Sequence, residues 1–276
     1  MSILRDIFQD RKNEIDGYIR LLKNIDPREK DLNAIETKRH RELLASLEID
    51  TEKRCILLAS LFILMYNMIE AVMSEASSFI VEEICKFSEK VKTNGKKFHE
   101  YLNDPIRHQW ILSCFDNNIT HNSKRRIEEY DKLYQAINAK KFIFTKIKKS
   151  RSGNWDDETI EKFAKVIGVK LNISDELKRK VKEVCFGYKQ KIGQYKTKQV
   201  GNKTKQVGII GYIRVQRNRL AHGEISFSEC GNIPISYMND IYETLKRYLD
   251  EVIGAFENFI EQKDFVVDKN IFEDVS

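Results

Sequence analysis

The stretch from residue 55 to residue 69, CILLASLFILMYNMI, constrains the fold most, because it is almost uninterrupted apolar. Such a run must be buried on nearly all sides, either in lipid or inside a protein. A membrane span needs about 20 apolar residues, and Asn67 and Glu70 would be costly in lipid. We therefore predict a long helix at the centre of a helical bundle, in a protein with no membrane partner.

The composition also favours helices. The 276 residues include 12 glycines and 3 prolines, together about 5% of the chain against roughly 12% in average proteins, which excludes collagen-like and many-stranded sandwich folds. Five widely spaced cysteines without a CxxC pair are typical of reduced thiols in the cytoplasm. The N-terminal residues show no signal peptide, so we expect a cytoplasmic protein.

Apolar residues recur at spacings of three and four along most of the chain, which predicts an all-α fold. Helices are expected at residues 3–25, 28–48, 51–90, just after 105, 124–138, 156–167, 175–195, 209–222 and 237–262. Two copies of KTKQVG, at 196–201 and 203–208, predict a mobile loop. We expect a main helical domain at 49–262, an N-terminal helical pair at 1–48 that packs on it or extends from it, and a loosely ordered tail at 263–276.

The segment IIGYIRVQRNRLAHG, residues 209–223, contains a candidate site. On a helix, Arg217 falls on the same stripe as three apolar residues, Ile209, Ile213 and Leu220. A guanidinium in that position must be paired, hydrogen-bonded or placed at the mouth of an interface, because burying it alone is prohibitive. The pattern therefore marks Arg217 as a residue with a specific role.

Asn218 and His222 are four residues apart, so they lie on one helix face and are within hydrogen-bonding reach. The partial negative charge of a helix C-terminus favours a positively charged His222, which suits a general acid or an anion ligand. A structural interpretation remains open, in which Arg217 pairs with a carboxylate such as Glu70 and His222 only caps the helix.

Common cofactor and metal motifs do not occur. The sequence has no P-loop, Rossmann GxGxxG, HExxH or GxSxG motif. The five histidines never pair with one another at spacings of three or four. The sequence therefore predicts neither a metal nor a cofactor.

The hexapeptide RNRLAH, residues 217–222, matches the R-N-x-x-x-H form of the Rx4–6H motif of the HEPN superfamily. Three more blocks resemble the MAE-like HEPN proteins, a group of small bacterial chains. They are an opening FQDRKNEIDGYIRLL, a core helix with YNMIE at 66–70, and SGNWD at 152–156. The four blocks occur in the expected order, so the chain resembles this family over most of its length.

The resemblance implies a HEPN-type helical bundle with extra N-terminal helices. It also implies a metal-independent endoribonuclease, in which the RNA 2′-hydroxyl attacks the adjacent phosphate to give a 2′,3′-cyclic phosphate. Arg217 would then hold the phosphate, His222 would transfer protons, and Asn218 would orient both of them. Glu70 would position Arg217 or assist proton transfer, with Asn67 a second candidate; a structural polar role is open for both. The family typically forms homodimers in which the two motif helices face each other.

Basic residues lead into this segment and predict contact with RNA. Between residues 178 and 205 ten lysines and arginines accompany a single acid, Glu183, with two tyrosines interleaved. The usual alternative for such a run is a solvated lysine face. The residues predicted to bind RNA are Arg214, Arg219, Lys189, Lys191, Lys196 and Lys198.

Three hypotheses about function remain at this stage. The first is a ribonuclease that acts as a toxin or an anti-phage defence effector. The second is a non-catalytic HEPN module that binds RNA, a nucleotide or a partner protein. The third is a toxin paired with a separate nucleotidyltransferase antitoxin. An antitoxin or a defence-system protein is therefore an expected partner besides RNA.

Overall fold

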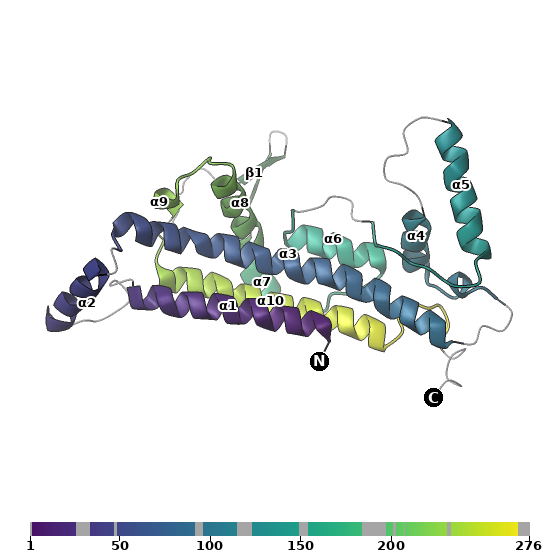
Figure 1. Ribbon diagram of the computed structural model, residues 1–276, viewed down its shortest axis with the longest axis horizontal. Helices are drawn as coiled ribbons and strands as arrows, with labels where there is room; N and C mark the ends of the chain where they lie inside the picture. Colours follow the sequence, from purple (N-terminus) through teal and green to yellow (C-terminus); the bar gives the residue numbers. More distant parts are fainter. Residues whose placement is uncertain are drawn as a thin grey trace. The chain divides into compact units, whose positions relative to one another are not determined.

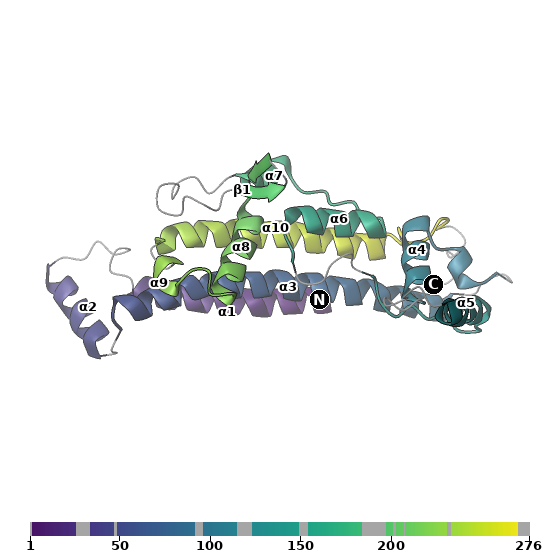
Figure 2. The ribbon, with the colours of Figure 1, turned by 90° about the horizontal axis from the view of Figure 1, so that it is seen from above.

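The computed structural model describes most of the chain (Figure 1, Figure 2). The described residues are 2–25, 34–46, 49–91, 96–114, 123–148, 154–183, 197–200, 203–206, 208–230 and 233–269. The chain divides into two compact units. The first unit contains Met1–Val72, Asn154–Glu158 and Ile173–Asp250, and the second contains Met73–Gly153, Thr159–Asn172 and Glu251–Ser276. The predicted boundary between residues 48 and 49 stays a prediction.

The fold is all-α, as predicted. The helices are α1 (Ile3–Ile25), α2 (Ala34–Ser46), α3 (Thr51–Lys90), α4 (Asp104–Ser113), α5 (Ser123–Asn138), α6 (Asp157–Ile167), α7 (Asp175–Lys182), α8 (Ile209–Ala221), α9 (Phe227–Cys230) and α10 (Ile235–Glu261). A 3₁₀ turn at Phe98–Glu100 precedes α4. The described residues also include one two-stranded hairpin, β1 (Thr197–Val200) and β2 (Lys203–Gln206).

The first helix packs against α3 and α10 within the first unit (Figure 1, Figure 2). The Tyr18 hydroxyl donates to the Leu57 carbonyl at 2.8 Å, and the Tyr242 hydroxyl donates to the Lys12 carbonyl at 3.2 Å. The buried residues of α1 recur at helical spacing and are Leu4, Phe8, Ile15, Ile19, Leu22 and Ile25. The amphipathic pattern of the sequence therefore packs as expected.

The apolar run lies in the N-terminal half of α3, which begins at an N-cap where Asp50 Oδ1 accepts from the Lys53 backbone N–H at 2.7 Å. Leu61, Phe62 and Met65 are fully buried. By length and composition alone, α3 would be able to cross a membrane; its most apolar window has a mean hydropathy of 2.0 and is 56% buried. The burial agrees with the predicted role of the run as a core helix.

The second unit has an aromatic core. Phe98 contacts Phe142 with ring centroids 4.8 Å apart, and His99 stacks on Trp110 at 4.7 Å. Burial lowers the pKa of His99. Residues 264–267 lie within the tail that we expected to be loosely ordered, yet they are hydrogen-bonded to residues 101–103. Residues 270–276 of that tail lie outside the described residues.

Two predicted segments differ from the structure. The helix expected at 175–195 ends at Lys182, and residues 184–195 lie outside the described part of the chain. The KTKQVG copies, expected in a mobile loop, pair as antiparallel strands with Lys198 opposite Lys205. The pairing is the reason for this difference: each copy supplies the other with a partner for backbone hydrogen bonds.

Candidate functional site

The candidate site is built on α8, and both ends of this helix are fixed by glycines. At the N-cap Gly208, an added Cβ would lie 2.3 Å from the Val181 carbonyl oxygen, so only glycine lets α8 start this close to α7. At the other end Gly223 has φ +68°. The Glu224 N–H donates to the Arg219 carbonyl at 2.8 Å and the Gly223 N–H donates to the Leu220 carbonyl at 3.3 Å, which is a Schellman C-cap. The predicted end of the helix at Gly223 is confirmed.

Arg217 is held on three sides. Its Nη2 donates to Glu70 Oε2 on α3 at 3.2 Å, and its Nη1 donates to Asn218 Oδ1 at 2.8 Å. Its guanidinium carbon lies 4.2 Å from the centroid of the Tyr66 ring, in a cation–π contact. The Arg217 side chain is still 27% exposed. The site therefore presents a cation that is positioned in advance and remains open to solvent.

The Arg217–Glu70 pair agrees with the structural interpretation that the sequence left open. The side chains of Arg217 and Glu70 are 27% and 33% exposed. Solvent therefore screens the ion pair, and its contribution to the stability of the fold is small. Because a guanidinium has five N–H donors, the two bonds to Glu70 and Asn218 leave donors for an anion. The ion pair and a phosphate-binding role are thus compatible.

The segment 154–156 fastens α8 to α3. Asn218 Nδ2 donates to Asn154 Oδ1 at 3.3 Å, and the Trp155 backbone N–H donates to the Tyr66 hydroxyl at 3.1 Å. Burial raises the pKa of Tyr66, against the opposing effect of the Trp155 N–H bond. Tyr66 therefore stays a neutral ring under the guanidinium at physiological pH. The segment arranges the site although it lies far from α8 in sequence.

His222 is the C-cap of α8 and is exposed. Its backbone N–H donates to the Asn218 carbonyl at 2.9 Å. Among the described residues, the imidazole has no hydrogen bond to Asn218 or to any other side chain, so the side-chain bond between them that the spacing suggested does not form. The ring is consequently accessible to a ligand or to a second chain.

Arg214 and Arg219, both predicted to bind RNA, have internal partners instead. Arg214 Nη1 lies 3.0 Å from Asp156 Oδ2, and only 11% and 12% of these side chains are exposed. The Arg219 side chain is 9% exposed, with its Nε 3.9 Å from Glu224 Oε2. The helical wheel could not show this burial, because it contains no information on packing across the fold. Neither arginine is available as a surface contact in this conformation.

The remaining predicted residues are less well placed. Lys189, Lys191 and Lys196 lie outside the described residues, and Lys198 is described only as a backbone position on β1. Asn67 is exposed on α3, three residues before Glu70. The structure thus brings together Arg217, Asn218 and Glu70, and leaves the RNA-binding lysines as predictions.

Sequence reasoning gave no role to Tyr66, Asn154 and Asp156. All three lie in the YNMIE and SGNWD blocks, which were noted only for their resemblance to a family. The available signal was the polar character of these residues inside blocks that resemble a family. In the structure Tyr66 contacts Arg217, Asn154 accepts from Asn218, and Asp156 pairs with Arg214 of the same helix.

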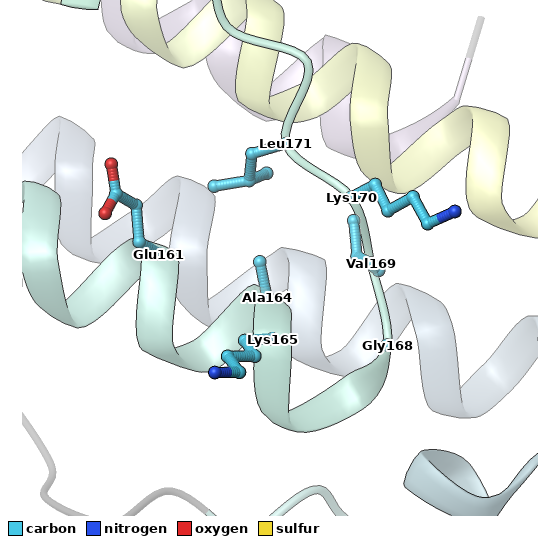
Figure 3. A pocket seen from close by; sticks show the side chains of 7 residues that line it. All are labelled: Glu161, Ala164, Lys165, Gly168, Val169, Lys170 and Leu171. Atoms are coloured by element: carbon cyan, nitrogen blue, oxygen red, sulfur yellow. The ribbon is translucent and has the colours of Figure 1, made fainter.

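The described residues also form a pocket whose side chains do not converge on a ligand (Figure 3). A pocket of about 300 Å³ in the second unit is lined by Glu161, Ala164, Lys165, Gly168, Val169, Lys170 and Leu171 (Figure 3). Figure 3 shows the amino groups of Lys165 and Lys170 pointing in different directions, so the lining does not converge on a ligand. Within the described residues, no group of three or more His, Cys, Asp or Glu side chains is placed to hold a metal ion.

Comparison with known proteins gives one match. A protein-family model described as MAE_28990-like HEPN matches residues 2–265. No curated protein and no solved structure matches the chain significantly. The family match covers nearly the whole chain, including α8 and the contacts of Arg217 with α3. The chain therefore belongs to the MAE_28990-like HEPN family.

Proposed function

We propose that the protein is a metal-independent endoribonuclease that acts as a homodimer. HEPN membership supports a nuclease or RNA-binding module in general. The observation that carries the finer proposal is Arg217, which is fixed by Glu70, Asn218 and Tyr66 yet partly open to solvent. A guanidinium held in this way can bind a phosphate without having to be ordered first.

The proposed reaction is transesterification within the RNA. A general base removes the proton of the 2′-hydroxyl, and the oxygen attacks the adjacent phosphorus. The bond from phosphorus to the 5′-oxygen breaks, and a general acid protonates that oxygen. The products are a 2′,3′-cyclic phosphate and a 5′-hydroxyl, with charge balanced throughout.

The proposed roles of the residues are consistent with their positions. Arg217 neutralises the charge that builds up on the phosphate oxygens. His222, exposed at the end of α8, serves as the general base or acid. Because one imidazole cannot perform both proton transfers in the same step, Glu70, which contacts Arg217, would assist with the second one. Two chains with facing α8 helices would bring Arg217 of one chain to His222 of the other. Within this proposal the protein acts as a toxin or a defence effector.

The test is incubation of the purified protein with total tRNA and mRNA in the presence of a chelator, followed by mapping of the product ends. We expect 2′,3′-cyclic phosphate and 5′-hydroxyl ends. Arg217→Ala and His222→Ala should each lower the cleavage rate by about a hundredfold or more. The matched controls are Arg20→Ala and His108→Ala, which remove exposed residues of the same types elsewhere.

Two results would contradict the nuclease proposal. One is wild-type cleavage by both site variants, and the other is the loss of all cleavage in chelator. RNA binding without cut ends would instead favour the non-catalytic module. Expression in bacteria tests the toxin role, since only the wild-type chain and the two controls should inhibit growth.

A further inference from the structure

Helix α5, in the second unit, exposes its apolar side. Ile127 is 63% exposed, Tyr130 67%, Tyr134 70% and Ile137 37%. In contrast, Glu129 of the same helix is only 6% exposed, and it accepts a bond from Lys132 at 2.6 Å. An amphipathic helix normally buries its apolar face, so the orientation of α5 requires an explanation.

The four residues form one continuous stripe. Their spacing is three, four and three, which places them within roughly 80° of arc on an α-helix. This is the spacing of the a and d positions of a coiled coil. We refer to Ile127, Tyr130, Tyr134 and Ile137 as the α5 stripe.

We propose that the α5 stripe packs against the α5 stripe of a second copy of this chain, with the two helices parallel. Charges beside the stripe select this occupant. With the stripe at a and d, Arg126 takes position g and Asp131 takes position e, five residues later, and both are exposed. In a parallel pair, residue g of one helix faces residue e of the next heptad on the other. Arg126 then faces the partner's Asp131, and two-fold symmetry makes this contact twice.

An antiparallel pair would lack this match. Residues at g then face g, and residues at e face e, which places Arg126 opposite the partner's Leu133 and Asp131 opposite the partner's Asn138. No opposite charges meet in that arrangement. The α5 stripe makes apolar contact in both the parallel and the antiparallel arrangement, but only the parallel arrangement pairs Arg126 with the partner's Asp131.

The contact is expected to be weak. α5 has 16 residues, about two heptads, and such a contact falls below the roughly 1,200 Å² of a stable interface. It is separate from the candidate site, because Arg217 and His222 lie in the first unit and α5 lies in the second. The proposal therefore holds whether or not the chain cleaves RNA.

Sedimentation velocity of the full chain over a range of concentrations tests the proposal. Tyr130→Glu combined with Tyr134→Glu should abolish one association step, whereas Gln135→Glu, an exposed change on the same helix outside the stripe, should leave it intact. If α8 also pairs chains, the wild type shows two association steps, and the Tyr130→Glu/Tyr134→Glu variant keeps the step through α8 and loses the step through α5. Circular dichroism checks that each variant stays folded.

A charge exchange supplies the sharper test. Arg126→Asp alone and Asp131→Arg alone each set like charges face to face at two symmetric places, and we expect about tenfold weaker association. The double variant, Arg126→Asp with Asp131→Arg, restores opposite charges and should recover the wild-type constant. A monomeric wild-type chain at high concentration would overturn the proposal, and so would a double variant that associates no better than the single ones.

Discussion

The side-chain amide of Asn218 satisfies both of its hydrogen bonds in only one orientation. Its Nδ2 donates to Asn154 Oδ1, and its Oδ1 accepts from Arg217. If the amide turned over, its NH₂ group would face the guanidinium, which also carries only donors. The donor-only guanidinium therefore fixes which way the Asn218 amide faces, and Asn154 holds the amide in that position.

Replacing Asn154 tests this chain of contacts. Asn154→Ala frees the Asn218 amide, and we expect kcat for RNA cleavage to fall about tenfold, as for the loss of one positioning hydrogen bond, with little change in KM. Asn154→Asp keeps an acceptor for Asn218 Nδ2 and should recover most of the rate. Steady-state kinetics on a short RNA measure both. Equal activity of Asn154→Ala and the control Asn172→Ala would show that Asn154 does not position the site.

At this scale the sequence predicted part of the site. The Rx4H spacing identified Arg217, Asn218 and His222, and Glu70 was considered as a partner of Arg217. The contacts that complete the site join residues 147 and 64 positions apart, Glu70 with Arg217 and Asn154 with Asn218. Helical periodicity describes neighbours within one helix, so it could not predict which distant residues would meet.

At the scale of the elements, Gly168 and Gly17 should respond oppositely to the same substitution. Gly168 ends α6 with φ +82°, and an added Cβ would lie 3.2 Å from Pro105 Cγ. Gly168→Ala should therefore lower the free energy of unfolding by about 1–2 kcal/mol, because an L-residue is strained there. Gly17 lies within α1, where an added Cβ meets nothing within 4 Å. Gly17→Ala should raise the free energy of unfolding by about 0.5–1 kcal/mol.

Urea unfolding followed by circular dichroism measures both changes. The two variants serve as controls for each other, since each adds one methyl group. A Gly168→Ala variant as stable as the wild type would contradict the strain that the backbone angle implies.

The helices themselves were largely predictable. Helices α1, α3 and α8 begin and end within a residue or two of the predicted ranges, since their apolar spacing and their ends agree. The prediction for α7 ran past Lys182 because no glycine or proline occurs between Asp175 and Phe186 to mark an earlier end of the helix. The β1–β2 hairpin had a signal, the Gly201-Asn202 pair between two identical segments, which is typical of hairpin turns.

At the scale of the molecule, the proposed dimer makes a prediction about shared sites. Within one chain, Arg217 contacts Glu70, Asn218 and Tyr66, whereas the imidazole of His222 has no side-chain partner among the described residues. We therefore expect Arg217 of one chain to act with His222 of the other. Mixing Arg217→Ala chains with His222→Ala chains should then restore activity.

The expected recovery is about a quarter of the wild-type rate, because half of the randomly formed dimers are mixed and each keeps one of two intact pairs. The measurement is RNA cleavage after the two variants are unfolded and refolded together. Each variant refolded alone is the control. If the mixture stays as inactive as each variant alone, the proposal that Arg217 of one chain acts with His222 of the other is wrong.

The two compact units are interleaved along the sequence. The backbone passes from one to the other five times, after Val72, Gly153, Glu158, Asn172 and Asp250. No single continuous fragment of the gene encodes either unit, and α8 expressed with only its sequence neighbours would lack both Glu70 and Asn154. A truncated chain that carries α8 is consequently expected to lack the contacts that position Arg217. A single protease cut in a loop would divide the polypeptide but would not separate the two compact units.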